Sequence, residues 1–251
     1  MLFVSHVNAA SCFIAAENDH MITKEGACDE RYTPASTFKI VIALMGFDAH
    51  ILLDQTHPVW DFKPGYVDWI QRWQQPHNPK LWFVNSCVWY SQVITKKLGM
   101  DRFNTYVRRF HYGNQDTSGD KGMHNGLSHC WLSSSLKISP QEQIDLLNQL
   151  VANRLPVSVD AQEKTKSIMY QSRLPNGWDL YGKTGNGSYA VLSGQKRQDR
   201  QAGWFVGFVR KGNKTITFVQ LIIDEDQQDT YASLRAKAAL KDRLEQLIIQ
   251  R

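Results

Sequence analysis

Residues 34–47 read PASTFKIVIALMGF, a short polar opening followed by an apolar run that predicts a buried helix over 40–47. Ser36 and Lys39 are three residues apart, so on a helix their side chains share one face and the Lys39 amine can reach the Ser36 hydroxyl. The unpaired backbone N–H groups of a first helical turn are available to an oxyanion. The stretch therefore predicts a serine that can be activated to attack a carbonyl.

The Ser-x-x-Lys spacing by itself also has an ordinary explanation. Taken alone, Ser36 fits a helix cap and Lys39 a solvated surface charge. Only this pair opens an apolar helix, so the functional interpretation depends on residues elsewhere in the chain. Three other pairs have the same spacing: Ser118 with Lys121, Ser134 with Lys137, and Ser193 with Lys196.

The composition is that of a protein with a substantial buried core. The chain has 251 residues, of which 42% are hydrophobic and 21% are charged, and these values suit one or two globular domains. The net charge of +5 comes from basic residues interspersed with acids, and the eight Trp lie mostly in apolar segments. Nucleic-acid binding, which favours a basic stripe with exposed aromatics, is therefore not expected.

Neither a membrane span nor a metal site is predicted. The longest charge-free apolar run, 40–47, is far shorter than the roughly 20 residues that cross a bilayer. The eight His and four Cys form neither a Cys-x-x-Cys pair nor a His-Glu-x-x-His motif. Residues 2–10 are mildly apolar and end in small residues, which fits either the remnant of an export signal or simply the start of the expressed chain.

The four cysteines allow two interpretations. Cys12 and Cys28 flank a predicted hairpin, with strands over 12–16 and 21–23. A disulfide between them is expected if the protein is exported to an oxidising compartment. The alternative is that both are small buried residues. Cys87 and Cys130 fit packing positions better than bonded ones.

Strand patterns lie at both ends of the chain, with helical patterns between them. After the N-terminal hairpin, strands are predicted only late, over 178–184, 202–210 and 214–223, the last two joined by a tight turn at 211–213. Ser139 and Glu142 form a capping box that opens a helix extending to Val151. Further helices are predicted over 160–170 and 231–249.

This order predicts a mixed α/β fold with an antiparallel sheet, flanked by terminal helices and interrupted by an inserted all-helical domain. Residues 1–35 and 172–251 would form the α/β domain, and residues 36–171 the helical one. The active site would lie in the cleft between them.

A second motif decides the functional interpretation. Lys183, Thr184 and Gly185 lie at the end of the predicted strand, and together with the Ser36 and Ser86 motifs they resemble the three-part set of penicillin-recognising serine enzymes. The chain most resembles class D serine β-lactamases, also called oxacillinases. The residues that carry this resemblance are Pro34 to Lys39, Ser86 to Val88, Tyr112 to Asn114, Trp131, Leu132, Lys183 to Gly185, Gly203, Trp204 and Gly207.

The resemblance implies that Ser36 opens the β-lactam ring to an acyl-enzyme and that Lys39 is N-carboxylated (N6-carboxylysine), acting as general base for acylation and deacylation. No other cofactor is expected, but carbon dioxide or bicarbonate would be needed. Trp131, whose indole nitrogen only donates, would hold the carboxylated lysine. The apolar surroundings that lower the lysine pKa would come from Phe38, Val88, Trp131 and Leu132.

The resemblance also implies substrate contacts. Ser86 would relay a proton between Lys183 and the lactam nitrogen, while Thr184 and Arg235 would bind the substrate carboxylate. Gly185 precedes Asn186, whose backbone N–H, with that of Ser36, would form the oxyanion hole. The alternative for Arg235 is an ordinary solvated arginine, because arginines are common on helix surfaces. Tyr112 to Asn114 would support recognition.

The expected substrate is a β-lactam antibiotic, and its hydrolysis would give resistance. The expected location is the periplasm or the medium, and the expected state is a monomer or homodimer. Two rival interpretations stay open: a penicillin-sensing receptor domain that is acylated without turnover, and a cell-wall DD-peptidase.

Overall fold

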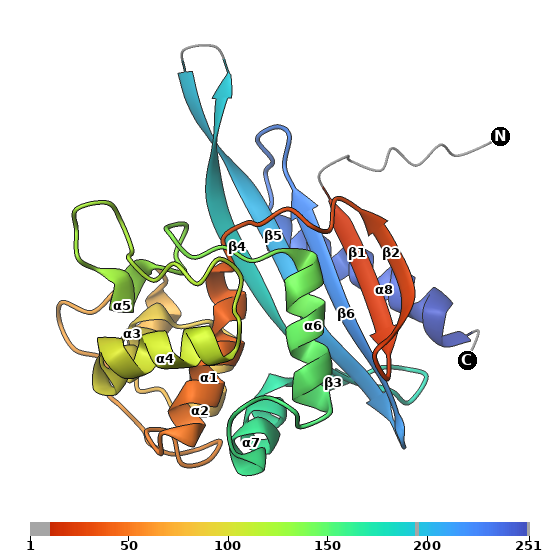
Figure 1. Cartoon of the computed structure of the whole chain (residues 1–251), viewed down its shortest axis with the longest axis horizontal. Helices are drawn as coiled ribbons and strands as arrows, with labels where there is room; N and C mark the ends of the chain where they lie inside the picture. Colours follow the sequence, from red (N-terminus) through yellow and green to blue (C-terminus); the bar gives the residue numbers. More distant parts are fainter. Residues whose placement is uncertain (1–10, 194–195, 250–251) are drawn as a thin grey trace.

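The computed structural model describes residues 11–193 and 196–249. Its centre is one six-stranded sheet in the order β2-β1-β6-β5-β4-β3, with every neighbouring pair antiparallel (Figure 1). The N-terminal hairpin pairs with the C-terminal strand, so the sheet is assembled from both ends of the chain as predicted. The strands are β1 (Cys12–Glu17), β2 (His20–Gly26), β3 (Tyr170–Arg173), β4 (Asp179–Ser193), β5 (Lys196–Lys211) and β6 (Lys214–Ile223).

The helices occupy mainly the middle of the chain, which confirms the mixed α/β class. The helices of the middle segment are α1 (Lys39–Asp48), α2 (Pro79–Asn85), α3 (Val88–Leu98), α4 (Met100–Arg109), α5 (Gly126–His129), α6 (Pro140–Val151) and α7 (Val159–Met169), with short 3-10 turns η1 (Ala35–Phe38) and η2 (Gln71–Trp73). Helix α8 (Ala232–Ile249) closes the described chain. Within this part of the chain, no helix combines the length and apolar character needed to span a membrane.

The sheet is covered on both faces because successive side chains of a strand point to opposite sides. Phe13 and Phe205 face one side and pack in a cluster with Leu240 of α8. Ile14 and Val206, each one residue further along its strand, belong to a second cluster that includes α6 and α1. Figure 1 shows α8 behind the sheet and α6 in front of it. The second cluster is continuous with the helical core, and it links the sheet to α1.

Helix α6 lies in the segment predicted to be a separate helical domain, yet it contacts β6 and β1. It begins with the predicted capping box, since Glu142 N–H donates to Ser139 Oγ and Ser139 N–H donates to the Glu142 carboxylate. The division into 1–35 with 172–251 and 36–171 stays an interpretation, in which α6 is the helix that joins the two parts.

The structure corrects several predicted boundaries. Strands β4 and β5 continue as a paired hairpin well past Thr184 and before Ala202, beyond the bounds predicted for both strands. Regular backbone pairing, rather than an alternation of apolar side chains, carries this extension. The predicted helix over 160–170 ends at Met169, and Tyr170 starts the unpredicted short strand β3.

Cys12 and Cys28 form a disulfide, so of the two interpretations the bonded one is correct. Cys87 and Cys130 are free and buried, as expected of packing residues. The proposed export remnant over 2–10 lies outside the described residues.

Candidate active site

Ser36 and Lys39 lie at the junction between η1 and α1. The prediction placed Ser36 at the start of a helix, whereas the structure places it in a 3-10 turn just before α1 begins at Lys39. The Lys39 Nζ donates to Ser36 Oγ at 3.2 Å, as the three-residue spacing predicted. Ala35, with φ of +48°, turns the chain sharply immediately before the serine. The hydroxyl and the amine are therefore within hydrogen-bond distance.

Lys39 is fully buried, and this burial changes its chemistry. Its exposed fraction is 0%. Burial penalises the ammonium form and lowers the pKa of Lys39 to about 8, an effect that the nearby Cys87 thiol only partly opposes. Burial raises the pKa of Cys87 itself to about 11, so at neutral pH it is a neutral thiol. Lys39 is thus much easier to deprotonate than an exposed lysine.

The turn that carries Ser36 is fixed from behind by a buried hydrogen-bond chain. Gln143 Nε2 of α6 donates to Thr37 Oγ1 at 2.9 Å, and Thr37 Oγ1 donates to the Pro34 carbonyl at 2.7 Å. Sequence reasoning did not identify Gln143, because a glutamine in a helix carries no motif of its own. These two hydrogen bonds fix the turn that carries Ser36 against α6, the helix that packs on the sheet.

Strand β4 passes directly against this turn, and Gly185 allows the approach. A Cβ at Gly185 would lie 2.7 Å from the Pro34 carbonyl oxygen and 3.0 Å from the Thr37 nitrogen. Real Cβ atoms do not approach so closely, so only glycine fits without displacement. The structure therefore brings the Lys183 to Gly185 segment against the turn that carries Ser36.

Lys183 is the second buried lysine of the site, with an exposed fraction of 3%. Its Nζ donates to the Thr184 carbonyl at 3.0 Å and lies 5.8 Å from the centre of the Phe83 ring. Burial, reinforced by the positive charges of Lys39, Lys237 and Arg72, lowers the pKa of Lys183 well below its usual value. The positive charge of Lys39 is thus close enough to Lys183 to affect its pKa.

Ser86 lies at the end of one helix and just before the start of the next. It terminates α2 in a left-handed conformation with φ of +58°, and α3 begins two residues later at Val88. A left-handed serine is uncommon and is found where the surrounding structure enforces it. The next residue, Cys87, interacts electrostatically with Lys39, so this turn lies beside the first motif.

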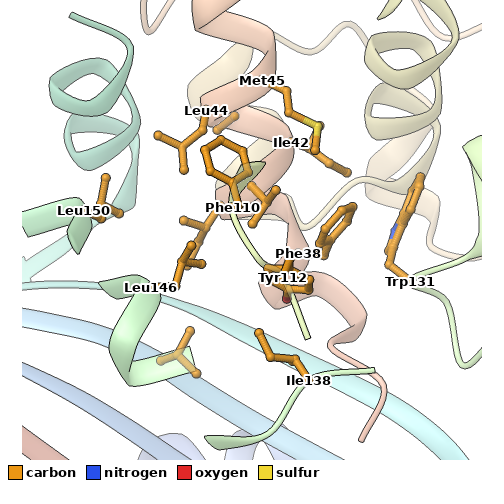
Figure 2. Close-up of a cluster of buried hydrophobic side chains, with 14 of the residues drawn as sticks. Phe38, Ile42, Leu44, Met45, Phe110, Tyr112, Trp131, Ile138, Leu146 and Leu150 are labelled. Atoms are coloured by element: carbon orange, nitrogen blue, oxygen red, sulfur yellow. The ribbon is translucent and has the colours of Figure 1, made fainter. Parts of the chain in front are cut away.

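Trp131 provides a buried donor with no acceptor. Its ring stacks on Phe38 with ring centroids 5.6 Å apart. Figure 2 shows Trp131, Phe38 and Tyr112 in the same buried cluster. The ring is fully buried, and its Nε1 has no hydrogen-bond partner among the described residues. Leaving such a donor unpaired costs about 1–3 kcal/mol. Val88 is also buried and Leu132 packs partly buried against the same core, so both belong to the expected apolar surroundings.

Two hydrogen bonds connect the Trp131 loop and β5 to the segment before Ser36. Thr33 Oγ1 donates to the Trp131 carbonyl at 3.1 Å, and Trp204 Nε1 donates to the Thr33 carbonyl at 2.9 Å. Trp204 is thereby a structural residue that holds the turn. Tyr112 packs edge-on against Phe38 at 5.0 Å, and the Asn114 side chain donates to the Ser135 carbonyl, so both support loops behind the site.

The start of α8 lies against the residue that follows Gly185. Asn186 Oδ1 accepts a hydrogen bond from Ser233 N–H at 3.1 Å. Gly203 pairs with Asn186, and a Cβ there would lie 2.1 Å from the carbonyl carbon of Ala232. The glycine at 203 therefore lets the helix approach the strand closely.

Arg235, predicted to bind a substrate carboxylate, has an internal partner. Its Nη2 donates to both carboxylate oxygens of Asp224, at 2.6 and 2.7 Å. Sequence reasoning missed Asp224, which directly follows β6 and belongs to no motif. The structure brings the Ser36, Ser86, Trp131 and Lys183 motifs together. It places Arg235 in an ion pair with Asp224, two residues after Ser233, whose N–H donates to Asn186.

Comparisons with known proteins agree with this geometry. The sequence-family model described as penicillin binding protein transpeptidase domain matches residues 8–245 of the chain. The β-lactamase OXA-9 of Klebsiella pneumoniae is 40% identical over 234 residues, covering 92% of this chain and 85% of that protein. OXA-1 of Escherichia coli is 42% identical over 212 residues, covering 84% and 73%.

The fold is shared as well. The crystal structure of the class D β-lactamase OXA-427 matches with a TM-score of 0.87 and 42% sequence identity, covering 95% of this chain and 100% of that one. These matches confirm the resemblance inferred from the motifs. The chain belongs to the penicillin binding protein transpeptidase domain family and, within it, to the class D β-lactamases.

Proposed function

We propose that this chain hydrolyses the β-lactam amide of penicillin-type antibiotics through an acyl ester on Ser36, and so confers resistance. The observation that carries the proposal is the 3.2 Å hydrogen bond between Lys39 Nζ and Ser36 Oγ, with Lys39 fully buried. A neutral amine in this position can accept the serine proton, which an exposed ammonium cannot. The named β-lactamases OXA-9 and OXA-1 support the same substrate class.

Acylation would begin when Ser36 Oγ attacks the lactam carbonyl carbon and its proton passes to the base at Lys39. The backbone N–H groups of Ser36 and Asn186 are proposed to stabilise the oxyanion, each donor contributing about 3 kcal/mol to the transition state. As the lactam C–N bond breaks, Ser86 would deliver a proton to the nitrogen, with Lys183 as its neighbour. Thr184 and Arg235 would hold the substrate carboxylate.

Deacylation needs a base that activates water, and we propose that Lys39 carries a carboxyl group for this step. Two observations support the modification: burial lowers the pKa of Lys39 to about 8, and the Trp131 Nε1 lacks an acceptor among the described residues. A lysine must be neutral to add carbon dioxide, and a carboxylated lysine would supply the anionic acceptor that the indole lacks. When present, the carboxyl group supplies a general base for both half-reactions.

Export is part of the proposal. A disulfide such as Cys12–Cys28 persists in oxidising compartments and is rare in reducing ones, which supports a periplasmic or secreted location. The expectation of a monomer or homodimer stays a prediction, to be measured by sedimentation.

A chromogenic β-lactam assay with enzyme far below substrate tests the function. We expect continuous turnover that vanishes in Ser36→Ala. A single burst equal to the enzyme concentration, without a steady state, would instead identify a penicillin-sensing domain. Release of the terminal D-alanine from a peptide substrate, with no β-lactam turnover, would identify a DD-peptidase.

A further inference from the structure

The ion pair between Arg235 and Asp224 gives Asp224 a role that no sequence motif indicated. Both backbone polar groups of Asp224 are hydrogen-bonded: its N–H donates to the Gln201 carbonyl at 2.9 Å, and its carbonyl accepts from Tyr189 Oη at 2.6 Å. The Gln201 side chain accepts, through Oε1, a hydrogen bond from Ala232 N–H at the start of α8. The backbone of Asp224 is therefore anchored to β4 and β5, and Gln201 of β5 in turn contacts the first residue of the helix that carries Arg235.

The two partners differ in exposure. The Asp224 side chain is 3% exposed, whereas that of Arg235 is 31% exposed. Both hydrogen bonds to Asp224 come from Nη2, and the Arg235 Nε is buried without a hydrogen-bond partner among the described residues. A guanidinium has five N–H donors. One end of the guanidinium is thus fixed by a buried acid, while donors remain for a second acceptor.

Arg235 also lies near the proposed carboxylate-binding residues. Near the start of its helix, Ser233 N–H donates to the side chain of Asn186. Asn186 lies two residues after Thr184 in β4. An arginine that is free to rotate must lose much of its rotamer freedom on binding a ligand. A rigid, buried acceptor removes that loss in advance.

We propose that Asp224 is a positioning residue that holds the Arg235 guanidinium ready for the substrate carboxylate. This inference rests on the proposed function. A competing effect has the opposite sign: if Asp224 mainly neutralised Arg235, its removal would strengthen the binding of a carboxylate. The sign of the effect therefore decides between positioning and competition.

The test compares a chromogenic cephalosporin with its methyl ester, which lacks the carboxylate charge. The quantity measured is the ratio of kcat/KM for the acid to kcat/KM for the ester. Asp224→Asn keeps the size of the side chain, and we expect it to lower this ratio about tenfold, mainly through KM of the acid. A raised ratio would show competition and overturn the proposal.

A double-variant cycle tests whether Asp224 acts through Arg235. Arg235→Gln should lower the ratio by at least as much, and adding Asp224→Asn to it should change the ratio by less than twofold. An equal further loss in the double variant would overturn the proposal. Glu163→Gln, which removes the acid of the Lys166–Glu163 pair on α7, is the matched control and should leave the ratio unchanged.

Thermal melting of each variant identifies loss of fold. If Asp224→Asn does not fold, Arg235→Lys decides, because it keeps both charges but replaces the fork of donors by a point charge. We expect its ratio to fall to the level of Arg235→Gln, and a wild-type ratio would refute positioning. Failure of the wild-type protein to turn over either substrate would count against the proposed function itself, which is a separate result.

Discussion

The buried state of Lys39 leads to a quantitative prediction about pH and carbon dioxide. Its pKa of about 8, against an ordinary value of 10.5, means that at pH 7 about one molecule in ten carries the neutral amine, compared with about one in three thousand for an exposed lysine. Below pH 8, conversion of the ammonium and carbon dioxide to the carboxylated lysine releases two protons. At fixed carbon dioxide, the ratio of carboxylated to free Lys39 therefore falls about 100-fold for each unit of pH.

This steepness sets the expected activity. If about nine-tenths of the protein is carboxylated at pH 7.5, about one-tenth remains so at pH 6.5, and steady-state turnover falls about tenfold with it. Raising dissolved carbon dioxide tenfold at pH 6.5 should restore about half of the modified protein and about half of the lost rate. An ordinary loss of activity at low pH would not respond to carbon dioxide.

The assay combines steady-state kinetics under controlled carbon dioxide with carbon-13 NMR of protein equilibrated in labelled carbon dioxide. We expect one carbamate resonance at pH 7.5 that weakens at pH 6.5. Lys39→Met should remove it, whereas Lys183→Met, which alters the other buried lysine of the site, should retain it. A resonance that survives Lys39→Met, or a rate at pH 6.5 that ignores carbon dioxide, would refute the reasoning from the Lys39 pKa.

Three further predictions follow from individual contacts. Trp131→Phe keeps the stacked ring but removes the unpaired Nε1 donor, so we expect deacylation to slow at least about tenfold and the acyl-enzyme to accumulate, as measured by mass spectrometry. An unchanged deacylation rate would exclude the indole as a partner of Lys39. Gly185→Ala brings a Cβ to 2.7 Å from the Pro34 carbonyl oxygen and should slow acylation, measured by stopped flow, about 100-fold by displacing β4. A change of less than about threefold would count against the close packing of β4 on the turn that carries Ser36. Replacing Cys12 and Cys28 together by serine removes a link between residues 16 apart. The free energy of unfolding should fall by about 3 kcal/mol and the calorimetric Tm by roughly 6–12 °C. Four titratable thiols in the denatured, unreduced wild-type protein would show that the bond is absent.

The predictable parts of the fold rest on local rules. The capping box at Ser139 and Glu142 and the tight turn at 211–213 are local signals, and the structure contains both. The long β4–β5 hairpin was missed beyond Thr184 because its strands are held by backbone pairing, which side-chain patterns do not report. The left-handed serine at 86 was also missed, since its conformation is enforced by the two helices that meet there.

The sequence by itself determined the chemistry available to this protein. The three-residue spacing places Ser36 and Lys39 on one face because helical geometry is a local property, and the motif at 183–185 can be recognised from its residues alone. Only the tertiary structure decided the electrostatics. The lowered pKa of Lys39, the unpaired Trp131 donor and the pairing of Arg235 with Asp224 each arise from segments far apart in the chain, because burial and charge depend on what packs around a residue and not on its neighbours in sequence.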